Sequence, residues 1–244
     1  MFELISETEY RETMENTVEP QLAAIREELS MPLENGGVLH AELYEQQSAT
    51  RAVIVLHGYT ESGEKFREMT WYFLQSGFNV YAIDHRGHGK SARSVEETWL
   101  THVDHFSDYV NDLEAFMDHV VLPRTKNLPL CLYAHSMGGA VGGMTLQRHP
   151  KRFARAVLTA PMIAPSSAPF PSWMGAGIAK FMCAIGKTKR WRLSASRSTQ
   201  KTRRSRLLSA RAARVLTTTR ASGLKTRICK TPRRPTAGSR KPSA

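Results

Sequence analysis

The sequence lacks the features that mark a secreted or membrane-spanning protein. It has only three cysteines in 244 residues, an odd and widely spaced set that gives neither a disulfide framework nor a zinc pattern. No apolar run approaches the roughly 20 residues that span a bilayer, and the acidic N-terminal segment does not resemble a signal peptide. We therefore expect a cytoplasmic protein whose membrane contact, if it has any, is peripheral.

Acidic residues are missing from the second half of the chain. The last acid is Asp118, and residues 187–244 hold 19 Lys and Arg but no Asp or Glu. Residues 1–186, in contrast, hold all 22 acids and carry a net negative charge. An acidic body is thus followed by a basic segment that has too few apolar residues to form a core.

Strands and helices are expected to alternate along the body. Residues 4–30 have the polar pattern of one or two helices, and residues 38–44 alternate as a half-exposed strand does. Apolar runs typical of buried strands then alternate with amphipathic segments typical of helices: strands at 52–56, 78–83, 128–134 and 154–160, and helices at 64–76, 104–120 and 137–148. This order predicts an α/β fold with a parallel sheet, whose chemistry lies in the loops after the strands.

Residues 130–140, LCLYAHSMGGA, have the pattern of a nucleophile elbow. Ser136 lies between a predicted strand and a predicted helix, among small residues such as Gly138, because a bulky side chain would collide with the neighbouring elements. Free N–H groups at a helix N-terminus favour a developing negative charge. His57 and Gly58 follow the first buried strand, where a second donor is expected. The alternative is an ordinary turn with a capping serine.

Five motifs together point to a family. They are VIVLHGYTES, YAIDHRGHGKS, THVDHFSDYVNDL, LYAHSMGGA and AVLTAPM, and they lie within residues 51–165. In this order they resemble the α/β-hydrolase superfamily, in its lysophospholipase and monoacylglycerol-lipase branch. The resemblance implies a serine hydrolase that cleaves carboxylic esters of monoacyl lipids and needs no cofactor. It also implies a lid, expected here to start at residues 167–186, through which the protein could contact a membrane.

The resemblance also assigns roles to residues. Ser136 would be the nucleophile, and the backbone N–H groups of Tyr59 and Met137 would form the oxyanion hole. The supporting residues would be His57, Gly58, His135, Gly138, Asp84 and Arg86, of which the last two would brace the loop after the second buried strand. No metal is expected, because neither a Cys nor a carboxylate stands at ligand spacing from the histidines.

The catalytic triad is incomplete in this sequence. A serine hydroxyl needs a histidine to take its proton and a carboxylate to orient that histidine. In this superfamily the chain order is serine, acid, histidine. After Ser136 there is one histidine, His149, and no acid. With neither the triad acid nor the triad histidine present, we expect negligible turnover from the chain as written.

Two interpretations stay open for the basic segment. It could bind polyanions, either nucleic acid or an anionic membrane, on a non-catalytic remnant of the fold. It lacks the interleaved aromatics of a single-strand binder, and we expect no specific nucleic-acid partner. It could instead be an out-of-frame translation of the missing lid, acid and histidine segments, which its composition favours. Either way, we expect a partial α/β-hydrolase domain at 1–190, truncated before the strands with the acid and the histidine, and a disordered tail at 191–244.

Overall fold

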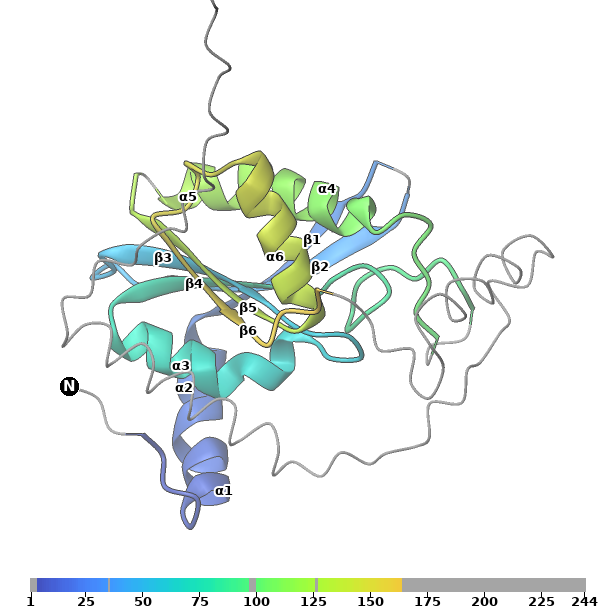
Figure 1. Ribbon diagram of the computed structural model, residues 1–244. Coiled ribbons are helices and arrows are strands. Elements are labelled where there is room, and N and C mark those ends of the chain that lie inside the picture. The colour runs from blue at the N-terminus through green and yellow to red at the C-terminus, as the bar shows by residue number, and fades with distance from the viewer. Residues whose placement is uncertain (1–3, 35, 97–99, 126, 164–244) are drawn as a thin grey trace, which may run out of the picture.

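One six-stranded sheet organises the protein (Figure 1). The computed structural model describes residues 4–34, 36–96, 100–125 and 127–163, so the expected lid and the basic segment lie outside the described residues. The strand order is β1-β2-β4-β3-β5-β6. The strands are β1 Arg26–Pro32, β2 Val38–Tyr44, β3 Arg51–Leu56, β4 Phe78–Ile83, β5 Leu130–His135 and β6 Arg155–Thr159.

The sheet is mostly parallel but not entirely. β4, β3, β5 and β6 run parallel to one another. β1 and β2 form an antiparallel hairpin, and β2 also pairs antiparallel with β4. Gly36 and Gly37 turn the hairpin with φ of +85° and +87°, which glycine adopts without strain. The predicted α/β-hydrolase sheet is therefore confirmed, with an antiparallel hairpin at one end.

Helices cover both faces of the sheet (Figure 1). α4 and α6 pack on one face, and the N-terminal helices and α3 on the other. Successive residues of β3 divide between the two cores, Ile54 facing the first and Val53 and Val55 the second, as the period of a strand requires. The helical segments are α1 Tyr10–Thr13, η1 Met14–Val18, α2 Glu19–Ile25, η2 Gly63–Phe66, α3 Arg67–Gln75, α4 Ser107–Phe116, η3 Met117–Val121, α5 Leu122–Thr125 and α6 Met137–Arg148.

The structure corrects the N-terminal prediction. Helical structure was expected to extend through residues 4–30, but it ends at Ile25, and β1 follows at once. The polar sequence of β1 forms a strand because every one of its residues pairs with β2, from Arg26 opposite Tyr44 to Pro32 opposite Val38. Pairing between segments that are distant in sequence has overridden the local pattern.

The prediction of a half-exposed strand at residues 38–44 is also wrong. Every residue of β2 except Val38 is buried. The alternation itself holds, since Leu39, Ala41 and Leu43 face the core under α4 and α6. The polar residues of the other face are buried with partners instead of facing solvent. Glu42 is one of them, because its carboxylate accepts hydrogen bonds from Arg67 (2.9 Å) and from the Tyr44 hydroxyl (2.6 Å).

The remaining predicted elements agree closely with the structure. Strands β3 to β6 match their predicted ranges within two residues at each end, as do α6 and the combined η2 and α3. The helix predicted at 104–120 begins at Ser107 and continues to Thr125. In the part of the chain that is described, no helix is long and apolar enough to cross a bilayer.

Candidate active site

Ser136 occupies the sharp turn between β5 and α6. Its φ of 52° and ψ of −115° lie in a region that a non-glycine residue adopts only under strain. Neighbouring backbone holds this conformation: the Ser136 N–H donates to the Thr159 carbonyl (3.0 Å), and the Ser136 carbonyl accepts from the N–H groups of Met162 (2.9 Å) and Ala140 (3.2 Å). An ordinary capping serine accepts a hydrogen bond from the first turn of its helix. The Ser136 side chain makes no such bond to α6.

Close approach of α6 to β3 explains the glycine after the elbow. The Gly138 N–H donates to the His57 carbonyl (3.1 Å). A Cβ at Gly138 would lie 2.6 Å from that carbonyl oxygen and 2.8 Å from the Leu56 Cβ, and neither of these atoms can move without shifting β3. The small residue is therefore required by packing between a helix and a strand, as the elbow pattern predicted.

Two unengaged N–H groups lie beside the elbow. Met137 is the first residue of α6, and Tyr59 lies on the loop after the adjacent strand β3. Within the described ranges, neither backbone N–H has a hydrogen-bond acceptor. The two loops touch, since a Cβ at Gly58 would lie 3.0 Å from the Ser136 Cβ. The two N–H groups thus belong to two loops that meet at Ser136.

His57 is buried beneath the Tyr59 loop. Its Nε2 accepts the backbone N–H of His85 (2.9 Å), so its Nδ1 carries the proton and donates to the Gly58 carbonyl (2.7 Å). Burial lowers the pKa of His57 to about 4. With both nitrogens engaged by backbone, His57 shapes the loop and cannot serve as a base for Ser136.

Asp84 ties together the loops after β3 and β4. Its carboxylate accepts the N–H groups of Gly63 (2.7 Å) and Lys90 (2.9 Å) and lies 3.0 Å from the His40 Nδ1. Burial alone would raise the pKa of Asp84, but these hydrogen bonds hold it below its usual value. The contacts are those of a structural brace.

Arg86 connects the loop after β4 to α4. Its Nε donates to the Asp112 carboxylate (2.6 Å), and a second guanidinium nitrogen contacts the other carboxylate oxygen. This bidentate pair is largely shielded from water, with 15% of the Arg86 side chain and 6% of the Asp112 side chain exposed. Asp112 escaped the sequence analysis because nothing in the local pattern distinguishes it from an exposed acid on a helix.

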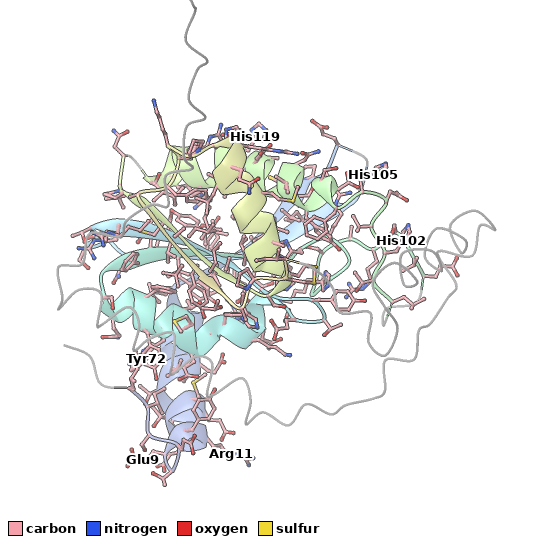
Figure 2. All side chains as sticks on the ribbon, in the orientation of Figure 1. Glu9, Arg11, Tyr72, His102, His105 and His119 are labelled. Atoms are coloured by element: carbon pink, nitrogen blue, oxygen red, sulfur yellow. The ribbon has the colours of Figure 1, made fainter. Side chains whose placement is uncertain are left out.

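The two histidines nearest to Ser136 along the chain, His135 and His149, have other partners. His135 directs its Nδ1 at the Thr159 hydroxyl (3.1 Å), and His149 contacts Glu114 (3.1 Å) at the far end of α6. A twelve-residue helix is about 18 Å long, so His149 is out of reach. Figure 2 shows His102, His105 and His119 at the periphery. Among the residues that the structure describes, no hydrogen bond reaches the Ser136 hydroxyl, and no cluster of three or more potential metal ligands is found.

Sequence reasoning missed one residue at the centre of the site. The Glu61 carboxylate accepts the Gly58 N–H (2.9 Å), directly behind the Tyr59 loop. The Glu61 N–H also donates to the Gly58 carbonyl (3.2 Å), which closes a turn. The available signal was an acid three residues after a glycine, a spacing at which a carboxylate can accept a hydrogen bond from the backbone of a turn.

Relatives named as a lysophospholipase and a monoacylglycerol lipase match about half of the chain. Lysophospholipase L2 of Escherichia coli is 42% identical over 119 residues, which cover 49% of this chain and 35% of the relative. The monoacylglycerol lipase of Mycolicibacterium smegmatis is 31% identical over 135 residues, which cover 52% of this chain and 44% of the relative. The matches thus span less than half the length of these relatives.

A solved structure and a family model agree with these relatives. The carboxyl esterase of Bacillus coagulans, solved with glycerol, superimposes with a TM-score of 0.56 at 26% identity, over 69% of this chain and 53% of the esterase. A family model described as serine aminopeptidase, S33 (Hydrolase_4) matches residues 47–225, which is well over half of the chain. The protein therefore belongs to this family of α/β hydrolases, and within it resembles the lysophospholipases and monoacylglycerol lipases.

Proposed function

We propose that this chain carries the nucleophile and the oxyanion hole of a carboxylic-ester hydrolase for monoacyl lipids. One observation carries the proposal: a strained serine, Ser136, lies beside the loops of Tyr59 and Met137, whose backbone N–H groups have no acceptor among the residues that the structure describes. The relatives named as lysophospholipase and monoacylglycerol lipase support a lipid ester as the substrate class.

The reaction follows from this geometry. The Ser136 hydroxyl oxygen attacks the ester carbonyl carbon, and the carbonyl oxygen takes up the negative charge between the Tyr59 and Met137 N–H groups. The alcohol portion leaves with a proton, and water then releases the fatty acid from the acyl-serine. His57, Gly58 and Gly138 keep the two donors in place. His135, Asp84 and Arg86 hold the surrounding loops through the contacts described above.

Turnover also needs a base, which we do not assign to any described histidine. The sequence after Ser136 offers only His149 and no carboxylate. The chain as written is thus proposed to retain what an oxyanion hole supplies without a triad, which in serine proteases is about 10³–10⁴-fold over water. The alternative function, polyanion binding, depends on residues 187–244, which lie outside the described residues.

Selective modification of Ser136 tests the proposal on this chain. A fluorophosphonate forms a bond between the serine oxygen and phosphorus, releases fluoride, and gives the serine proton to added imidazole, which replaces the missing base. Mass spectrometry of tryptic peptides should show Ser136 modified at least about tenfold faster than the other serines, because the developing oxyanion is stabilised at this serine. The preference should vanish in urea.

Ser136→Ala provides the control for peptide assignment. Equal modification of Ser136 and the other serines in the folded chain would contradict the proposal, because it would mean that no oxyanion hole is formed. The site would then be a strand–helix turn without chemical function.

A further inference from the structure

We propose that Glu61 is a positioning residue that sets the direction of the Tyr59 N–H in the oxyanion hole. The inference rests on the proposed function, since it concerns one of the two donors assigned there. Glu61 lies two residues after Tyr59, and 19% of its side chain is exposed. Its contacts are with the backbone of Gly58, the residue that precedes the donor.

The direction of the Tyr59 N–H depends on the conformation of Gly58. The Tyr59 N–H and the Gly58 carbonyl belong to one rigid peptide group and point in opposite directions. The direction of the donor is therefore set by the two backbone angles of Gly58. Glycine restricts these angles less than any other residue, so the surroundings must fix them.

Glu61 contacts both peptide groups that flank Gly58. Its carboxylate accepts the Gly58 N–H (2.9 Å) and so fixes the peptide before the glycine. Its own N–H donates to the Gly58 carbonyl (3.2 Å), and His57 Nδ1 donates to the same oxygen (2.7 Å), so the peptide after the glycine is fixed as well. The Tyr59 N–H is thereby directed away from the Gly58 carbonyl and left unengaged.

A side chain at position 58 would restrict these backbone angles, but it would also disturb the Glu61 contact. A Cβ at this position would lie 2.8 Å from the Glu61 carboxylate oxygen, 3.0 Å from the Ser136 Cβ and 3.3 Å from the His135 ring. The carboxylate and the serine thus lie on the same side of Gly58, and a Cβ there would displace the Glu61 carboxylate and press on the Ser136 Cβ. A hydrogen bond from another residue must supply the restriction of the backbone angles that a side chain at position 58 would otherwise give.

The contact between Glu61 and Lys65 offers a matched control. The Lys65 Nζ lies 3.7 Å from the other carboxylate oxygen of Glu61, and 48% of the Lys65 side chain is exposed. Lys65 therefore affects the charge of the pair without contacting Gly58. If Glu61 acts through its hydrogen bond, Lys65→Met leaves the site unchanged.

The test compares rates of Ser136 phosphonylation, with imidazole as base, in the full chain. Glu61→Met has similar length but cannot accept the Gly58 N–H, and we expect it to be slower by about tenfold, less than the 10²–10³-fold that loss of a whole oxyanion donor costs. Glu61→Gln keeps an acceptor oxygen and should restore the rate to within about threefold, since a neutral acceptor still makes the bond. Lys65→Met should react at the wild-type rate.

Hydrogen exchange of the Gly58 amide tests the same hydrogen bond without any reaction at Ser136. In chain labelled with ¹⁵N-glycine, this amide should be protected in the wild type and in Glu61→Gln, and should exchange faster in Glu61→Met. A Glu61→Met chain that reacts at the wild-type rate, or a Gly58 amide that exchanges freely in the folded wild type, would overturn the inference. A wild type without preference for Ser136 would instead refute the proposed function, so the two failures are distinguishable.

Discussion

The backbone N–H of Ser136 donates a hydrogen bond of 3.0 Å to the carbonyl of Thr159. Through this bond, the last residue of β6 holds the strained residue that follows β5. The segment after β6 adds a second bond, from the Met162 N–H to the Ser136 carbonyl (2.9 Å). The conformation of the elbow therefore depends on backbone contacts with a segment more than 20 residues further along the chain, and not only on its own glycines.

Substitution of two glycines of α6 separates packing from helix propensity. Gly138→Ala places a Cβ 2.6 Å from the His57 carbonyl oxygen, so α6 must move from β3, and we expect a loss of about 2–3 kcal/mol in the free energy of unfolding. Gly143→Ala meets only the Leu158 side chain, at 3.9 Å, and should stabilise the helix by up to about 1 kcal/mol. Urea unfolding of both variants checks the difference, and equal stabilities would contradict the packing argument.

Removal of the carboxylate of Asp112 should be costly, because it takes both short hydrogen bonds from the partly buried Arg86 guanidinium and leaves it a longer contact of 3.7 Å with Asp108. We expect Asp112→Ala to lower the free energy of unfolding by about 3 kcal/mol. Arg124 and Glu27 form a similar two-pronged pair, but with 32% and 49% of their side chains exposed. Glu27→Ala should therefore cost less than about 1 kcal/mol. Thermal and urea unfolding measure the two losses of stability, and similar values for Asp112→Ala and Glu27→Ala would contradict this prediction.

The buried histidines should make the fold sensitive to mild acid. Burial lowers the pKa of His57 to about 4 and also lowers the pKa values of His85 and His88, so these side chains stay neutral in the folded protein. In the unfolded chain a histidine binds a proton below about pH 6.5. The unfolded state then binds more protons, and stability falls as the pH drops from about 6.5 towards 4.

His57 alone accounts for about 2 kcal/mol of this loss between pH 7 and pH 5, from its displaced pKa. Urea unfolding at the two pH values measures the total. His57→Gln should be less stable at pH 7 but should lose less on acidification. An identical pH dependence in the variant and the wild type would show that His57 is not held neutral by the fold.

Steady-state hydrolysis of a p-nitrophenyl ester by the chain as written should not exceed the residual acceleration of about 10³–10⁴-fold over water that an oxyanion hole supplies without a triad. The reason is that no histidine of the described ranges makes a hydrogen bond to the Ser136 hydroxyl and the sequence after Ser136 contains no acid. Sustained release of p-nitrophenol above this level that is abolished by Ser136→Ala would contradict this expectation. It would mean that groups of the body act as base and orienting carboxylate.

Local patterns in the sequence were sufficient for much of the fold and for the elbow. Apolar runs marked β3, β4 and β5 because strands buried on both faces need continuous hydrophobic residues. The apolar run at 154–160 also marked β6, but β6 lies at the edge of the sheet and none of its residues is buried. The small residues around Ser136 marked the elbow because a Cβ there meets neighbouring backbone. The sequence could not reveal β1, whose polar residues resemble a helix surface until they pair with β2.

The sequence by itself determined which residues could do chemistry: a serine between a strand and a helix, and a histidine and glycine after a neighbouring strand. Only the tertiary structure decided how they are held. Glu61 acquires its place behind Tyr59, and Asp112 its place beside Arg86, through contacts that form when separate segments meet. The physical reason is that periodicity reports burial along one element, whereas a hydrogen bond to a backbone group depends on the positions of two elements at once.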